Sequence, residues 1–192
     1  ERGLYKTTDG GETWKQVLTP ADKWTGVTSL LIDPRNPDKL YAATWARQRS
    51  IGAYVGTNEG AGIHTSNDGG ETWTELKTGL PEGNMGKIGM AISPMNPDVL
   101  YATIETDNRK GGFYRSADQG ASWTKVSDEI GAGTGPHYYQ EIFADQHQFD
   151  RVYIASNYSK VSDDGGKTWT PINTKRKHVD DHAMAFHPTD PD

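Results

Sequence analysis

The stretch Ser66-Asn67-Asp68-Gly69-Gly70-Glu71-Thr72-Trp73 contains the turn motif Ser/Thr-x-Asp-x-Gly-x-Thr/Ser-Trp, which decides the fold of this chain. The motif occurs four times, at residues 7–14, 66–73, 116–123 and 162–169. An internal repeat of roughly 40 to 50 residues with strand-like flanks is typical of a β-propeller, in which each blade is a small sheet that packs against its neighbours. The sequence therefore predicts an all-β propeller of four-stranded antiparallel blades.

Each position of the motif has a structural role in a tight turn between two strands. The aspartate can accept hydrogen bonds from backbone N–H groups of its own turn. The motif glycine allows a positive φ, and the tryptophan brings a large apolar surface to the seam between blades. These residues are Asp9, Gly11, Trp14, Asp68, Gly70, Trp73, Asp118, Gly120, Trp123, Asp164, Gly166 and Trp169. One aspartate per blade cannot converge on a single site, so we interpret them as structural.

With these residues the chain resembles the Asp-box, or BNR, repeat proteins, which include sialidases, sortilin-type receptors, xyloglucan-active endoglucanases and a photosystem II assembly factor. Residues 4–11 and the Pro-rich residues 33–38 look most like large bacterial secreted propellers of the sortilin-like and glycosyl hydrolase types. The resemblance implies a sialidase- or sortilin-like propeller in an extracellular or periplasmic location. It leaves the activity open, because Asp-boxes occur on catalytic and on purely binding propellers alike.

A second repeat sets the blade boundaries. The sequence of residues 32–42 recurs at 92–102, more loosely at 143–155, and begins again at 186–188, each time as strand, proline-bearing turn and strand. We expect the two outer strands of one blade at 1–18, whole blades at about 26–77, 86–126 and 137–172, and the first strand of the next blade at 181–192. The chain begins inside a repeat, so the remaining blades of the ring are expected from the same, longer polypeptide.

The composition limits the partners. The chain has 192 residues, no cysteine and a formal net charge of −6. Phosphate binding needs a basic surface, so nucleic acid is excluded as the main partner. No apolar stretch is long enough to cross a membrane.

Candidate binding residues lie in loops on the face opposite the Asp-boxes. The loop of residues 46–61 is longer than a turn requires and carries Arg47, Arg49 and Tyr54. Such extra length often marks a binding loop. Two further clusters at the mouth of the central channel contain His137, Tyr138, Tyr139, His178 and His182.

Three functions compete for these clusters. Glycoside hydrolysis needs two carboxyl groups, and the candidates are Glu141, Asp180 and Asp181. Glu141 also stands where the other blades have an apolar residue, which packing alone does not explain. A metal site is a second possibility, since two histidines and two aspartates lie within residues 178–182.

The metal interpretation is the weaker one, because the spacing is not that of a helical histidine pair and a hydrogen-bonded histidine is the better explanation. We therefore expect no metal and no cofactor. The third function is recognition of a peptide or glycan at the mouth of the ring, which needs only a concave surface with aromatic and charged groups. We favour this recognition function, and a glycoside hydrolase acting on a polysaccharide is the alternative.

Overall fold

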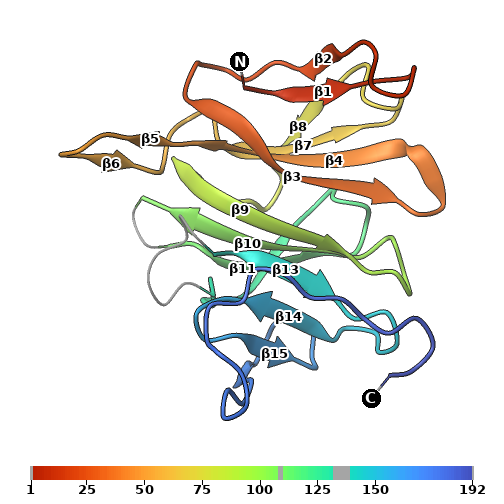
Figure 1. Ribbon diagram of the computed structural model, residues 1–192, viewed down its shortest axis with the longest axis vertical. Helices are drawn as coiled ribbons and strands as arrows, with labels where there is room; N and C mark the ends of the chain where they lie inside the picture. Colours follow the sequence, from red (N-terminus) through yellow and green to blue (C-terminus); the bar gives the residue numbers. More distant parts are fainter. Residues whose placement is uncertain (1, 108–109, 132–138, 192) are drawn as a thin grey trace.

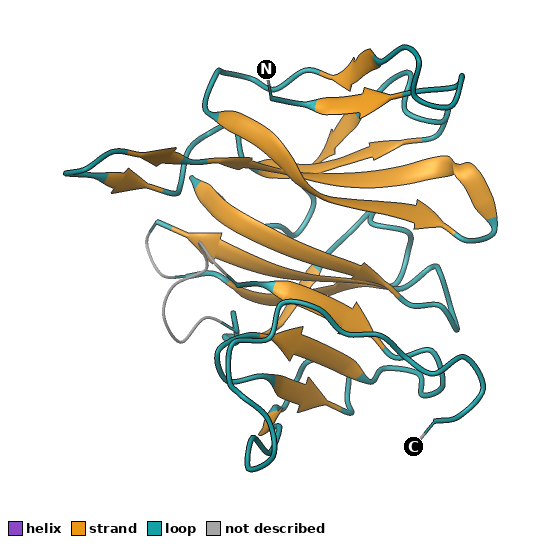
Figure 2. Cartoon of the chain, in the orientation of Figure 1, coloured by secondary structure: helices purple, strands orange, loops and turns teal. Residues whose placement is uncertain are grey.

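The computed structural model describes residues 2–107, 110–131 and 139–191, and in these ranges the chain consists of strands and loops without a helix (Figures 1 and 2). The first sheet is an antiparallel pair, β1 (Leu4–Lys6) and β2 (Lys15–Leu18). Three four-stranded sheets follow, which we call the first, second and third blades. The all-β, four-stranded antiparallel architecture predicted from the repeats is confirmed.

Neighbouring strands in each blade are consecutive in the chain, apart from the β5–β6 insertion in the first, and pair antiparallel. The first blade contains β3 (Thr25–Asp33), β4 (Asn36–Ala46), β7 (Gly62–Ser66) and β8 (Thr74–Leu76). The second contains β9 (Met85–Ile92), β10 (Leu100–Thr106), β11 (Gly112–Ser116) and β12 (Thr124–Ser127). The third contains β13 (Glu141–Ala144), β14 (Val152–Ala155), β15 (Lys160–Ser162) and β16 (Thr170–Pro171).

Residues 172–191 contain no strand, which differs from the expected innermost strand at 181–192. In all three blades the innermost strand pairs with the strand that follows it along the chain. Among the described residues, no strand pairs with residues 181–191.

The blades bury their faces against one another in two apolar clusters. Tyr41, Ile63, Ile88 and Ile104 belong to the cluster between the first and second blades. Phe113 belongs to the cluster between the second and third blades, where the Trp169 ring meets it edge-on at 5.0 Å. Burial of each large apolar side chain contributes about 1.5 to 3 kcal/mol, so packing between blades is the main source of stability.

The four Asp-boxes share one hydrogen-bond pattern. In the second, Asp68 Oδ1 accepts from Ser66 Oγ at 2.7 Å and from the Thr72 backbone N–H at 2.9 Å. The motif glycines have φ between +83° and +99°. These bonds lower the pKa of each motif aspartate; for Asp164, whose largest contribution is the Thr168 backbone N–H, the pKa falls to about 2.

The Asp-boxes and the Pro-rich turns lie at the same end of the blades, which we call the Asp-box end. The carbonyl oxygens of Asp38, Asp98 and Asp150 accept backbone N–H bonds from the Asp-boxes at 2.8 to 2.9 Å. This end forms the right edge of Figure 1, and the opposite end, which we call the open end, forms the left edge.

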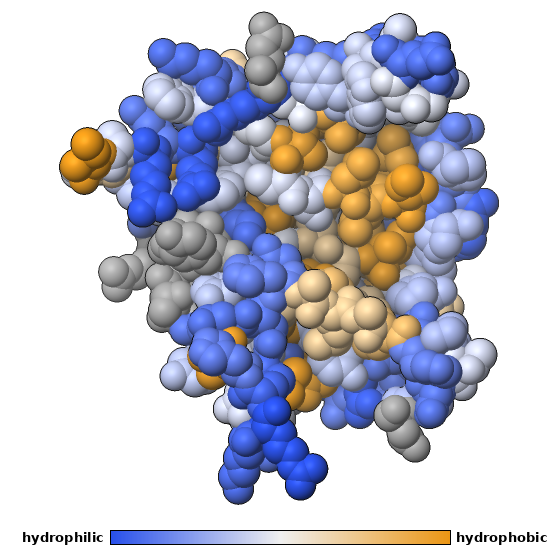
Figure 3. Space-filling view, viewed as in Figure 1, coloured by the Kyte–Doolittle hydropathy of each residue, from blue (hydrophilic) through white to orange (hydrophobic). Residues whose placement is uncertain are grey.

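Trp14 differs from the seam packing expected of the motif tryptophans, because its side chain is 61% exposed. It lines an open groove with Leu30 and Ile32 of β3, where Figure 3 shows an apolar area. The sheet that carries Trp14 has only two strands and covers less of β3 than a whole blade would. Trp123, between whole blades, is buried.

Candidate functional site

The open end brings together most of the residues predicted to bind a ligand. It contains the starts of β3, β9 and β13 and the ends of β4, β10 and β14, because the paired strands run in opposite directions. His137 and Tyr138 lie outside the described residues. The remaining candidates form three groups.

The first group is a projecting ribbon, residues 47–57, which we call the arm. It contains β5 (Gln48–Arg49) and β6 (Tyr54–Val55) and extends to the left in Figure 2. Its base is anchored, because Trp45 Nε1 donates to the Gly56 carbonyl at 2.7 Å and the Arg47 guanidinium lies 5.6 Å from the Trp45 ring. Ile51 at the tip is fully exposed. The arm is therefore attached at its base and has an exposed end.

The second group, the Tyr139 group, consists of Tyr139, His178, Asp180 and His182. Tyr139 Oη donates to Asp180 Oδ1 at 2.6 Å, and its ring stacks on His182 at 4.8 Å with an interplanar angle of 15°. His178 Nδ1 lies 3.8 Å from Asp180 Oδ2. Asp180 has a φ of +74°, a left-handed conformation that is uncommon outside glycine and that often occurs at functional sites.

Asp181 lies next to this group but has a different role. Its carboxylate accepts from Lys177 Nζ at 2.5 Å and from the Ser159 hydroxyl, and these two bonds lower its pKa. Its backbone N–H donates to the Ser156 carbonyl at 3.0 Å. Asp181 therefore anchors the 172–191 segment to the third blade.

The third group is an ion pair that sequence reasoning missed. Lys87 Nζ on β9 lies 2.9 Å from Glu141 Oε1 on β13. The unusual acidic residue at position 141 thus has a partner 54 residues earlier, on the adjacent blade. The signal for this pair was a charged residue of opposite sign on each of two innermost strands, Lys87 on β9 and Glu141 on β13.

Glu105, near the end of β10, was also missed. Its Oε2 atom is buried and has no hydrogen-bond partner in the described chain, and burial raises its pKa against the lowering effect of the Lys87 backbone N–H. A Cβ at Gly86 would overlap this oxygen, so the carboxyl group would have to shift if residue 86 carried a side chain. The signal in the sequence was a glycine near the start of β9, Gly86, on the strand that pairs with the one carrying Glu105.

No group of three or more His, Asp or Glu side chains within residues 2–107, 110–131 and 139–191 is arranged to hold a metal ion. The same ranges contain no helix long and apolar enough to cross a membrane.

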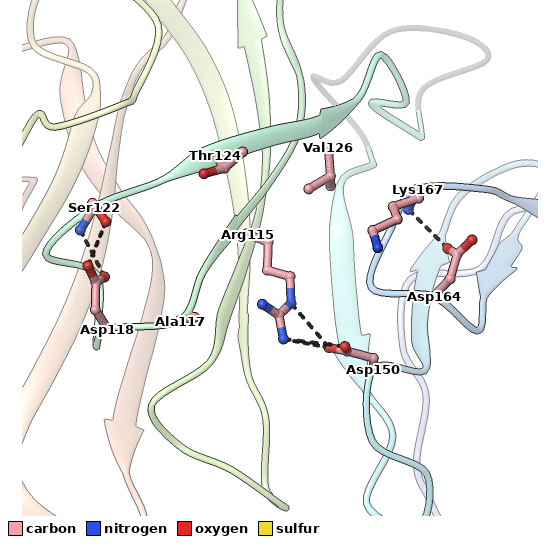
Figure 4. A pocket seen from close by; sticks show the side chains of 9 residues that line it. All are labelled: Arg115, Ala117, Asp118, Ser122, Thr124, Val126, Asp150, Asp164 and Lys167. Atoms are coloured by element: carbon pink, nitrogen blue, oxygen red, sulfur yellow. Dashed lines mark hydrogen bonds and ion pairs between the residues drawn. The ribbon is translucent and has the colours of Figure 1, made fainter.

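A separate pocket of about 430 Å³ opens at the Asp-box end, between the second and third blades (Figure 4). Its arginine and its three carboxylates are already paired or hydrogen-bonded. Arg115 Nη2 donates to Asp150 Oδ1 at 3.0 Å, and Asp118 and Asp164 are held by their own turns. This pocket is a structural junction rather than a reaction site.

Comparison with known proteins supports the fold. The BNR/Asp-box repeat family matches residues 5–16 and 160–171. A probable oligoxyloglucan-reducing end-specific xyloglucanase of Neosartorya fischeri is 29% identical over 95% of this chain and 24% of its own length. A xyloglucanase of Acetivibrio thermocellus is 33% identical over 69% of this chain and 16% of its own length.

The GH74 xyloglucanase from Xanthomonas campestris has a similar structure, with a TM-score of 0.64 and 23% identity over 92% of this chain and 28% of that one. At this identity the likeness shows the fold alone. The chain spans about a quarter or less of the length of the two curated relatives. The repeat match and the structural likeness agree with the four Asp-box turns and the four-stranded blades. The chain therefore contains Asp-box (BNR) repeats and has the four-stranded antiparallel blades of a β-propeller fold.

Proposed function

We propose that this chain is part of a glycoside hydrolase that acts on a xyloglucan-type polysaccharide, and that its open end contacts the glycan. The two curated relatives described above are xyloglucanases, which favours this function over a purely binding propeller. The observation that carries the proposal is that the arm, the Tyr139 group and the Lys87–Glu141 pair all lie at the open end. A peptide ligand stays a prediction of the sequence.

Sugar binding needs flat apolar faces beside hydrogen-bonding groups. The exposed His182 ring, supported from behind by Tyr139, is one such face. The Tyr54 ring of the arm, 42% exposed, is another. Asp180 and the Lys87–Glu141 pair provide acceptors and donors for sugar hydroxyl groups.

Hydrolysis of a glycosidic bond needs one carboxyl group that donates a proton and a second that acts as base or nucleophile. Glu105 holds its proton to a higher pH than an exposed glutamate, which suits the acid. Asp180 has a carboxylate that is 44% exposed and suits the second role. Glu141 and Asp181 are each held by a lysine, which makes them the less suitable candidates.

The test is release of reducing sugar by the full-length protein from xyloglucan, with cellulose and mannan in parallel. Asp180→Asn and Glu105→Gln are compared with Asp163→Asn, a matched change at the Asp-box end, where Asp163 pairs with Arg151. We expect release from xyloglucan, at least a hundredfold loss in the two open-end variants and little change in Asp163→Asn. The absence of any release by the wild-type protein would refute the hydrolase.

A polysaccharide substrate of this kind lies outside the cytoplasm. We therefore also propose an extracellular or periplasmic location, which secretion analysis of the native strain would test.

A further inference from the structure

Buried polar atoms without a hydrogen-bond partner are concentrated in one seam of the described chain, where β9 and β10 face β13. Seven such side-chain atoms are found among the described residues, and five of them belong to Thr103, Glu105, Gln140 and Glu141. Gln140 contributes both polar atoms of its amide, and the side chains of Gln140 and Thr103 are fully buried. Unpaired buried groups cost free energy and are rare in folded proteins, so a cluster of them calls for a functional reason.

The backbone is strained at the same place. Gln140 has a φ of +121°, which residues with a side chain rarely adopt. A Cβ on the facing Gly89 would overlap the Gln140 carbonyl oxygen and come within 2.9 Å of Thr103 Oγ1. The second and third blades therefore lie very close together at Gly89, and the strain and the unpaired amide belong to one residue. Strain of this kind persists where function maintains it.

A small pocket adjoins this seam on the innermost strands. It has a volume of about 150 Å³ and is lined by residues of β3, β9 and β13, among them Ser29, Gly89, Gln140 and Glu141. At ~30 Å³ per water molecule, this space holds about five waters. It is large enough for the hydroxyl-bearing edge of one sugar unit and too small for a polysaccharide chain.

We propose that Gln140, Thr103 and the Lys87–Glu141 pair form a subsite that binds the hydroxyl groups of a single sugar unit of the glycan. The inference rests on the function proposed above and names the part of the substrate that enters the seam. The amide and the hydroxyl each donate and accept hydrogen bonds, and the ion pair adds one strong donor and one strong acceptor without net charge. This set suits a neutral polyhydroxyl group better than an ion.

Binding would satisfy the polar atoms that now lack partners. Because the Gln140 and Thr103 side chains are fully buried and Thr103 does not line the pocket, a sugar reaches these groups only if the amide turns toward the pocket and gives access to the hydroxyl behind it. The sugar hydroxyl groups then replace the missing partners of the amide. Gln140 would then lower the stability of the folded chain and raise its affinity for the glycan.

The test uses this trade-off, with Gln140→Gly and Thr103→Val as variants. Gln140→Gly removes the steric cost of the positive φ together with the unpaired amide. Thr103→Val removes the unpaired hydroxyl at nearly constant side-chain volume. We expect both variants to have a urea midpoint equal to or higher than that of the wild-type protein. We also expect their affinity for xyloglucan oligosaccharides, measured by calorimetry, to fall at least tenfold.

Gln119→Gly is the matched control, because Gln119 also has a positive φ, +58°, but lies in an Asp-box. It should bind the oligosaccharides as the wild-type protein does. Wild-type affinity in Gln140→Gly and Thr103→Val would overturn the subsite and leave the proposed function intact, whereas a wild-type protein that binds no glycan would overturn both. If Gln140→Gly does not fold, the test rests on Thr103→Val alone. Wild-type affinity of that variant for xyloglucan oligosaccharides would then overturn the subsite.

Discussion

Lys87 Nζ lies 2.9 Å from Glu141 Oε1, and this ion pair joins the innermost strands of the second and third blades. The Lys87 side chain is 12% exposed and the Glu141 side chain 34%, so water screens the pair only in part. Loss of one partner leaves the other charge in a half-buried position, and this costs more than the pair itself contributes.

We expect Lys87→Met to lower the free energy of unfolding by about 1 to 3 kcal/mol, because Glu141 then remains without its counter-charge. The double variant Lys87→Met with Glu141→Leu should recover most of the loss, since no charge remains. A double-mutant cycle from urea unfolding measures the coupling between the two residues. If the losses of unfolding free energy in Lys87→Met and Glu141→Leu simply add in the double variant, the two residues do not interact.

A second contact between blades involves Tyr101 and Asp150. Tyr101 Oη donates to Asp150 Oδ1 at 2.6 Å, and Arg115 donates to the same carboxylate. We expect Tyr101→Phe to cost about 1.5 to 3 kcal/mol of unfolding free energy, as for a hydrogen bond to a charged acceptor. Tyr114→Phe is the control, because the Tyr114 hydroxyl has no hydrogen-bond partner among the described residues. Equal losses in the two variants would show that the Asp150 contact contributes nothing.

At Gly89 the backbones of two blades lie close together, since a Cβ there would overlap the Gln140 carbonyl oxygen. Neither backbone can move without separating the second and third blades. We expect Gly89→Ala to destabilise the protein by about 3 kcal/mol, the upper range for overpacking. Gly52→Ala, at a position on the arm with no atom within 4 Å of the added Cβ, should change stability by less than about 0.5 kcal/mol. Thermal unfolding of the two variants measures these changes in stability. A Gly89→Ala variant as stable as the wild-type protein would mean that the second and third blades are less closely packed at Gly89 than described.

The Asp-box turns could be predicted because all their interactions are local. Asp68 bonds to Ser66 and Thr72, which lie two and four residues away, so the motif itself contains the partners. The blades then follow from the repeat, because each copy has the same turn between the same pair of strands. The fold was therefore accessible from the sequence.

The candidate site was accessible only in part. Glu141 stood out as an acidic residue at an apolar position, but its partner Lys87 lies on another blade and its proximity depends on how the two sheets pack. Asp180 and Tyr139 were both named as candidates, yet only the folded segment shows that they bond to each other. Glu105 lies near the end of a strand, and its burial follows from the packing around it in the folded chain, which no local sequence pattern indicates.

Glu105 gives a pH dependence with a defined sign. Burial raises its pKa above the ordinary value of 4.5, so at pH values between 4.5 and the raised pKa the folded chain keeps a proton that the unfolded chain has lost. The stabilisation from this group is fully present below pH 4.5 and is lost as the pH rises through the raised pKa.

We therefore expect Glu105→Gln, which is neutral at every pH, to gain stability relative to the wild-type protein as the pH rises from about 4 to 7. The gain should not exceed about 1.4 kcal/mol per unit of raised pKa, and solvent screening reduces it further. Urea midpoints at several pH values measure the difference, with Glu82→Gln at an exposed position as the control for the loss of one charge. A difference between Glu105→Gln and the wild-type protein that stays constant with pH would mean that folding does not raise the pKa of Glu105, and it would remove this residue as the acid of the proposed hydrolase.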